Sequence, residues 1–143
     1  MTENPYADAM KILVGYTPAP EGVAALDFAV AHAKLTDAHL TVLNTGKNGD
    51  YSDPMYASSE DIDAVEAELG TSGLEYEIRR PNDGLSATDS LLGIAEETGA
   101  DLLVIGLRKR TAVGKLITGS TAQAVLLNAN VPVVCVPAGA KTG

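Results

Sequence analysis

Short apolar runs alternate along the chain with longer amphipathic stretches. The stretches, at residues 21–35, 58–70, 84–98 and 119–128, carry apolar residues at helical spacing. The apolar runs predict four buried strands, at residues 11–16 (KILVGY), 39–44 (HLTVLN), 101–106 (DLLVIG) and 131–136 (VPVVCV). The alternating run at residues 74–79 (LEYEIR) predicts a half-exposed edge strand. Strict alternation of strands and helices predicts a doubly wound α/β fold, in which helices cover both faces of a parallel sheet.

Residues at the helix boundaries indicate where the helices begin and end. Ser58 or Ser59 can cap the second helix, and Gly99 suits the carboxyl end of the third. The apolar residues predicted to face the sheet are Val23, Leu26, Val30 and Leu35 in the first helix, and Leu85, Leu91, Leu92 and Ala95 in the third.

Length and composition indicate one globular domain. The 143 residues suit a single domain over residues 1–143, with residues 1–10 and 138–143 as flexible tails. A hydrophobic content of 45% and a charged content of 20% are ordinary for a globular protein and exclude the disordered class.

Charge and the scarce reactive residues exclude several further classes. The net charge of −9 repels polyanions, which disfavours nucleic acid and anionic membranes as partners. The amino terminus lacks the layout of a signal peptide and no apolar run approaches about 18 residues, so we expect a cytoplasmic protein. His32 and His39 lack metal-ligand spacing, and Cys135 lies within a predicted buried strand. We therefore expect no metal site and find no catalytic constellation.

The segment between the last two strands carries the strongest functional signal. Four of the ten Lys and Arg residues lie there, between two glycines at 106 and 119. Gly106 ends a strand, and Gly119 opens a helix whose N–H groups and dipole favour an anion. This pattern predicts a phosphate site served by the cations Arg108, Lys109, Arg110 and Lys115.

Each of these features also has a purely structural interpretation. The glycine at 106 can serve a positive φ or the close approach of a ligand, but Gly106 can equally be a turn glycine without a ligand. Ser120 and Gln123 fit a capping box, S-x-x-Q, that would satisfy the N–H groups of their own helix. The basic residues can form a solvated surface or pair with acidic residues of the same chain. The sequence leaves these alternatives open.

The chain resembles the universal stress protein family over nearly its whole length. The resemblance is strongest in KILVGY, in ADLLVIG (residues 100–106) and in GSTAQAVLLNANVPVVCVP (residues 119–137). It implies an adenine-nucleotide α-hydrolase-like fold with five parallel strands in the order 3-2-1-4-5. It also implies a homodimer in which the last strand pairs with its counterpart through Val133, Val134, Cys135 and Val136.

Nucleotide-binding members of this family carry the pattern G-x2-G-x9-G-[ST]. Gly106, Gly119 and Ser120 match it, whereas Lys109 replaces the middle glycine. At the end of the first strand, where nucleotide-binding members tend to have an Asp, this chain has Tyr16, Thr17 and Pro18. The resemblance implies phosphate contacts from Gly106, Arg108, Lys109, Gly119, Ser120 and Thr121, and an adenosine side formed by Gly15, Tyr16, Thr17, Leu43 and Asn44. The ligands it suggests are ATP, AMP and cyclic AMP.

Three functions follow as hypotheses. The first is a cytoplasmic, dimeric stress-response module that holds an adenine nucleotide or a related phosphate ligand. The second is a family member that binds no nucleotide and acts through protein partners, which the substituted glycine and the missing Asp favour. The third, an enzyme of the same broad fold with slow ATP hydrolysis, is disfavoured because the chain has neither an HxGH-like pair nor an SGGxDS-like loop.

Overall fold

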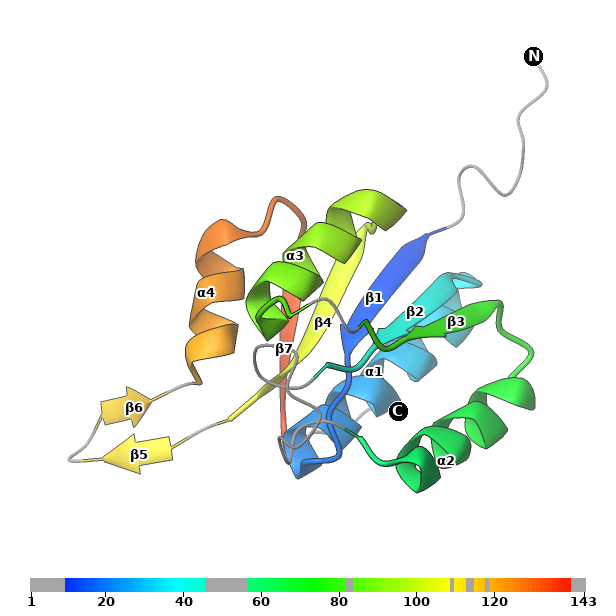
Figure 1. Cartoon of the computed structure of the whole chain (residues 1–143), viewed down its shortest axis with the longest axis horizontal. Helices are drawn as coiled ribbons and strands as arrows, with labels where there is room; N and C mark the ends of the chain where they lie inside the picture. Colours follow the sequence, from blue (N-terminus) through cyan, green and yellow to red (C-terminus); the bar gives the residue numbers. More distant parts are fainter. Residues whose placement is uncertain are drawn as a thin grey trace, which may run out of the picture.

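The computed structural model describes residues 10–45, 57–81, 84–108, 110–112, 115–117 and 119–139. Its centre is a five-stranded parallel sheet with the order β3-β2-β1-β4-β7 (Figure 1). This confirms the predicted fold class and strand order, with β7 as the fifth strand of the sheet. The strands are β1 (Lys11–Gly15), β2 (His39–Leu43), β3 (Tyr76–Arg79), β4 (Leu102–Leu107) and β7 (Val133–Pro137).

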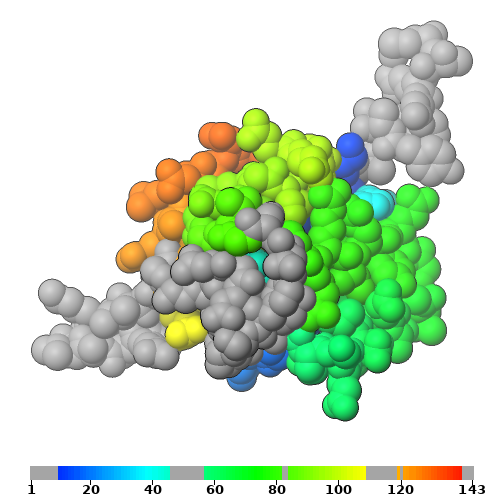
Figure 2. Space-filling model, in the orientation of Figure 1, coloured from blue at the N-terminus to red at the C-terminus, as the bar shows by residue number. Residues whose placement is uncertain are grey.

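The helices of the described residues divide between the two faces of the sheet. From β1 the chain steps outward to β2 and β3, and it then returns past β1 to β4 and β7. Right-handed crossovers therefore place the first two helices on one face and the last two on the other, where α3 and α4 lie side by side (Figure 2). The helices are α1 (Pro20–Thr36), α2 (Ser59–Gly70), α3 (Ala87–Thr98) and α4 (Ser120–Asn128).

Alternating side chains of the central strands supply two hydrophobic cores. In β1, Ile12 and Val14 pack in the core beneath α1 and α2, whereas Leu13 packs in the core beneath α3 and α4. Because both faces are buried, the central strands are almost continuously apolar, which is the pattern that the sequence shows.

Short polar residues fix the ends of the helices as the sequence predicts. Ser58 caps α2: its hydroxyl accepts from the N–H of Asp61 at 3.1 Å, and the Asp61 carboxylate accepts from the N–H of Ser58 at 2.9 Å. At the start of α3, a cap that we did not predict from the sequence, the Ser86 hydroxyl accepts from the N–H of Asp89 at 3.1 Å. Gly99 ends α3 with a φ of 66°, which is the left-handed conformation expected of a glycine C-cap.

The predicted buried face of α1 is partly wrong. Val23 and Leu35 are 40% and 84% exposed, so neither belongs to the core. The alanines instead form the stripe that faces the sheet, together with Leu26 and Val30; they are Ala25, Ala29 and Ala33. A stripe of alanines lets the helix approach the strands closely, whereas apolar spacing alone placed Val23 and Leu35 on this face. Leu85 is also misplaced, since it precedes α3 and is 45% exposed.

The basic segment contains secondary structure that the sequence did not predict. Two short strands, β5 (Arg110–Ala112) and β6 (Lys115–Ile117), pair antiparallel with Arg110 opposite Ile117. Figure 1 shows this pair beyond the end of β4, away from the main sheet. A strand of three residues is too short for its apolar and polar alternation to be distinguished from the sequence of a loop. Residues 1–9 and 140–143 lie outside the described residues, so flexible tails stay a prediction.

Candidate functional site

The carboxyl edge of the sheet brings the predicted site residues together. The chain leaves β1 toward β2 on one side and leaves β4 toward β7 on the other, so the strand order switches between β1 and β4. Ligands of open α/β sheets bind at such a switch point. The described residues that directly follow β1, β2 and β4 and the start of α4 all lie at this edge (Figure 1).

Gly106 is a glycine because α1 packs against it. A Cβ at this position would lie 2.6 Å from the carbonyl oxygen of Glu21 and 2.7 Å from its carbonyl carbon. Its φ does not lie in the left-handed region, so backbone conformation does not require glycine. The close approach that the sequence suggested for a ligand is thus made, on this side, by the first turn of a helix.

Arg108 already has an anionic partner within the chain. Its Nε lies 3.6 Å from a carboxylate oxygen of Glu21, and its side chain is 44% exposed. An exposed pair of this kind contributes at most about 1 kcal/mol, because water screens it. The pair supports the interpretation in which cations of this segment bind acidic residues of the same molecule, and a phosphate would compete with Glu21 for Arg108.

Of the other three predicted cations, Arg110 and Lys115 belong to described strands. Lys109 lies outside the described residues. The backbone places Arg110 and Lys115 in the β5–β6 pair, in which Lys115 lies opposite Ala112.

The start of α4 differs from the predicted capping box. Gly119 is the N-cap, with φ −68° and ψ 152°, and Ser120 is the first helical residue. The alternative in which Ser120 caps the helix through a box with Gln123 therefore does not hold, and no side chain of the described residues caps this N-terminus. A Cβ at Gly119 would meet no heavy atom of the described residues within 4 Å. The half-buried Thr121 follows in the first turn.

On the β1 side, Tyr16 and Thr17 turn their side chains into the fold. Tyr16 is 6% exposed in the core beneath α1 and α2. Burial raises the pKa of its phenol above the usual value, and the charges of Asp61 and Glu68 raise it further. Thr17 lies directly on α1, since a Cβ at Gly22 would come within 2.1 Å of its hydroxyl oxygen.

Asn44 is a buried junction of the strand ends. Its side-chain amide donates to the carbonyl oxygen of Tyr16 at 2.8 Å, and its side-chain oxygen accepts from the N–H of Ala57 at 2.9 Å. Its own N–H donates to the carbonyl oxygen of Arg79 at 3.0 Å. This residue therefore links the end of β1, the end of β3 and the segment that leads into α2. Leu43 is equally buried, in the core beneath α3 and α4.

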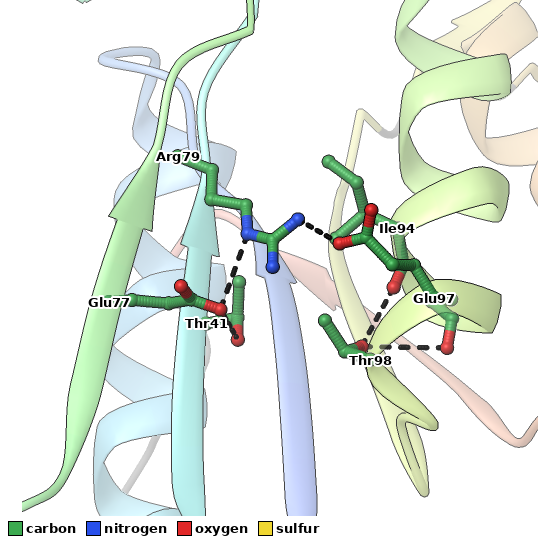
Figure 3. A network of polar contacts seen from close by, with 7 residues as sticks. Thr41, Glu77, Arg79, Ile94, Glu97 and Thr98 are labelled. Atoms are coloured by element: carbon green, nitrogen blue, oxygen red, sulfur yellow. Dashed lines mark hydrogen bonds and ion pairs between the residues drawn. The ribbon is translucent and has the colours of Figure 1, made fainter.

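A second polar cluster joins α3 to the edge of the sheet. Arg79 on β3 bridges to Glu77 at 3.3 Å and to Glu97 on α3, while Thr41 donates to Glu77 (Figure 3). The hydrogen bond to Glu97 raises the pKa of Arg79 above its usual value.

A cavity of about 230 Å³ lies near the amino ends of the strands, away from the predicted site. It is lined by Lys11, Ile12, His39, Thr41, Glu77 and Thr98.

The predicted dimer strand lies at the edge of the sheet. Within the described residues β7 pairs with β4 alone, with Cys135 opposite Ile105. Val133, Val134 and Cys135 are half-buried and Val136 is buried. Burial raises the pKa of the Cys135 thiol, so the thiolate is disfavoured and this cysteine suits packing rather than nucleophilic chemistry.

Sequence reasoning missed three residues at the carboxyl edge of the sheet. Glu21 and Gly22 pack the first turn of α1 against Gly106 and Thr17, and Ser90 on α3 is buried. The glycine at the third helical position of α1 could have indicated this close packing, because glycine is a poor helix former.

In the described part of the chain, no helix has the length and apolar character to cross a membrane. The same residues include no metal-holding group of three or more His, Cys, Asp or Glu.

The fold and this edge define a doubly wound α/β protein whose switch point lies beside an uncapped helix N-terminus. The universal stress protein family model matches residues 9–137. A universal stress protein of Mycolicibacterium smegmatis is 43% identical over 125 residues, which cover 87% of this chain and 95% of the relative. The chain belongs to the universal stress protein family.

Solved structures share the fold. A universal stress protein from Archaeoglobus fulgidus is 28% identical with a TM-score of 0.71, over 89% of this chain and 93% of that chain. A structure of the universal stress protein from the same organism in complex with dAMP is 25% identical with a TM-score of 0.64, over 89% of this chain and 97% of that chain.

Proposed function

We propose that this chain binds an adenine nucleotide or a related phosphate ligand at the carboxyl edge, between β1 and β4. The observation that carries the proposal is the start of α4, where no side chain of the described residues caps the helix and none of their heavy atoms would lie within 4 Å of a Cβ at Gly119. N–H groups and the helix dipole at such an end favour a phosphate. The A. fulgidus universal stress protein in complex with dAMP supports an adenine nucleotide as the ligand.

The two sides of the site have different roles in this proposal. The phosphate lies at the backbone of Gly119, Ser120 and Thr121, within reach of the cations Arg108 and Lys109. The adenosine lies near the ends of β1 and β2, beside the backbone of residues 15–17. Because the side chains of Tyr16 and Asn44 are engaged in the fold, they support this side rather than contact the ligand.

A second candidate function is binding of protein partners without a nucleotide. The ion pair between Arg108 and Glu21 favours it, because that cation is not reserved for a ligand. Lys109, which replaces the middle glycine of the family pattern, favours it as well. In this case the basic segment is a docking surface of a stress-response module.

We also propose a cytoplasmic homodimer that pairs through β7. The edge position of β7 and its half-buried apolar side chains support this state. Sedimentation over a range of concentrations should give the mass of two chains. A single-chain mass at every concentration would contradict the dimer.

Calorimetric titration with ATP, AMP and cyclic AMP tests the nucleotide function. We expect a saturable heat for at least one of them, and Arg108→Gln should weaken that ligand about tenfold by removing a charged hydrogen bond. Glu21→Gln is the matched variant, because it frees Arg108 and should tighten binding. An absence of heat for all three nucleotides would contradict the proposal and favour the partner-binding function. Mass spectrometry of molecules released on denaturation gives an independent answer.

A further inference from the structure

Helix α3 contains a buried hydroxyl that has no partner. Ser90 is 2% exposed, and its Oγ makes no hydrogen bond in the part of the chain that the structure describes. Such a group has lost its hydrogen bonds to water without replacement, which destabilises a fold. Thr98 in the same helix shows the usual solution, since its hydroxyl donates to the carbonyl oxygen of Ile94 at 2.7 Å.

The turn of α3 directs Ser90 toward β2 and β3. Ser90, Ile94 and Glu97 lie one above another on the helix, at positions i, i+4 and i+7. Glu97 binds Arg79 on β3, so this stripe faces the side of α3 on which β2 and β3 lie (Figure 3). On this side of the helix, β2 ends at the buried Leu43, and the buried Asn44 follows it.

Along the helix axis, Ser90 lies at the carboxyl edge of the sheet. It precedes Glu97 by about two turns, or roughly 10 Å, in the direction of the N-terminus of α3. The adjoining residue, Leu91, packs on the last residue of β1: a Cβ at Gly15 would lie 3.1 Å from its Cδ2. The unpartnered hydroxyl therefore lies beside the ends of β1 and β2, where the proposed site has its adenosine side.

We infer that Ser90 Oγ is a binding contact for the nucleoside part of the ligand, a contact that rests on the proposed nucleotide function. A serine hydroxyl offers one donor and two acceptors, which suits a ribose hydroxyl or a purine nitrogen. The proposed position of the phosphate, at the start of α4, lies on the opposite side of the switch point, toward β7. A ligand that spans the switch point thus presents its uncharged end to Ser90, and its hydrogen bond satisfies the buried hydroxyl.

Ser90→Ala and Thr98→Ala form a matched pair of hydroxyl deletions in one helix. Each full-length variant is unfolded in urea without ligand and titrated with AMP, adenosine and inorganic phosphate. Ser90→Ala should leave the urea midpoint unchanged or raise it, and should weaken AMP and adenosine by the same factor of about three to ten. Phosphate binding should not change. Thr98→Ala should lower the midpoint and leave all affinities unchanged.

The other outcomes overturn the inference in distinguishable ways. Equal affinity of Ser90→Ala and the parent chain for AMP excludes the contact but leaves nucleotide binding intact. A lower urea midpoint for Ser90→Ala shows that the hydroxyl has a partner within the protein, such as the carbonyl of Ser86, and also overturns it. If the parent chain binds neither AMP nor adenosine, the proposed function and this contact fail together.

Discussion

Two glycines flank the switch point, and they are glycines for different reasons. At Gly106 the space that a side chain would need is filled by the backbone of Glu21 in α1. At Gly119 the corresponding space holds no atom of the described residues within 4 Å. The family pattern treats both glycines alike, but only Gly119 leaves room for a ligand. A glycine in a binding motif can therefore be required by the packing of the fold rather than by the ligand.

The contrast extends to the residues around each glycine. On the α1 side, Thr17 packs on Gly22 and Asn44 joins the strand ends, so this side is closed and hydrogen-bonded. On the α4 side, the helix begins without a side-chain cap, close to the β5–β6 pair. On the α1 side, packing and hydrogen bonds hold the ends of β1 and β4 in place. On the α4 side, the first N–H groups of the helix can donate to a ligand.

The closed side is most sharply tested by Gly22→Ala, for which we expect the largest effect. The added methyl group would stand 2.1 Å from the hydroxyl oxygen of Thr17, and also 2.4 Å from its carbonyl oxygen and 2.6 Å from its nitrogen. Because two of these atoms are backbone, rotation of a side chain cannot relieve the overlap. We expect the free energy of unfolding in urea to fall by about 3 kcal/mol.

Gly93→Ala is the matched control. Gly93 lies within α3, and a Cβ there would meet no heavy atom of the described residues within 4 Å. Alanine should therefore raise the free energy of unfolding by about 0.5–1 kcal/mol through its better helix propensity. Equal effects of the two substitutions would contradict the packing argument for Gly22.

The fold was predictable because its determinants are local in sequence. Each strand appears as an apolar run, and Ser58 and Gly99 mark helix boundaries through bonds to residues one turn away. The alternation of these elements then restricts the sheet to a few topologies. Even so, Val23 and Leu35 were wrongly placed on the buried face of α1, because apolar spacing alone does not show which side of the helix packs on the sheet.

The site was predictable in position but not in detail. Parallel strands bring their carboxyl ends together, so the glycines of the motif could be placed at one edge. The reason for Gly106 lies in Glu21, far away in the sequence, and no periodicity links the two. In the same way, the sequence placed Asn44 beside a ligand, whereas its side chain binds Tyr16 and Ala57.

Asn44→Ala should have the next largest effect on stability. It removes two buried hydrogen bonds and leaves the carbonyl of Tyr16 and the N–H of Ala57 without this partner. We expect a loss of about 2 kcal/mol in urea unfolding. Asn128→Ala is the control, because the side chain of Asn128 makes one exposed hydrogen bond, to Ala124, and should contribute well under half as much. A similar loss for both would show that Asn44 is not a junction.

Gly119→Ala should have the smallest effect on stability and a clear effect on binding. Its backbone angles are ordinary for alanine and a Cβ would meet no heavy atom of the described residues within 4 Å, so these residues need no adjustment. The weaker N-cap propensity of alanine and the restriction of the unfolded chain oppose one another, which leaves a net change within about 0.5 kcal/mol. The methyl group nevertheless stands where a phosphate would approach the N–H groups of α4. Calorimetry should therefore show a loss of nucleotide affinity at an unchanged urea midpoint, whereas unchanged affinity would place the phosphate elsewhere and remove the difference between the two glycines.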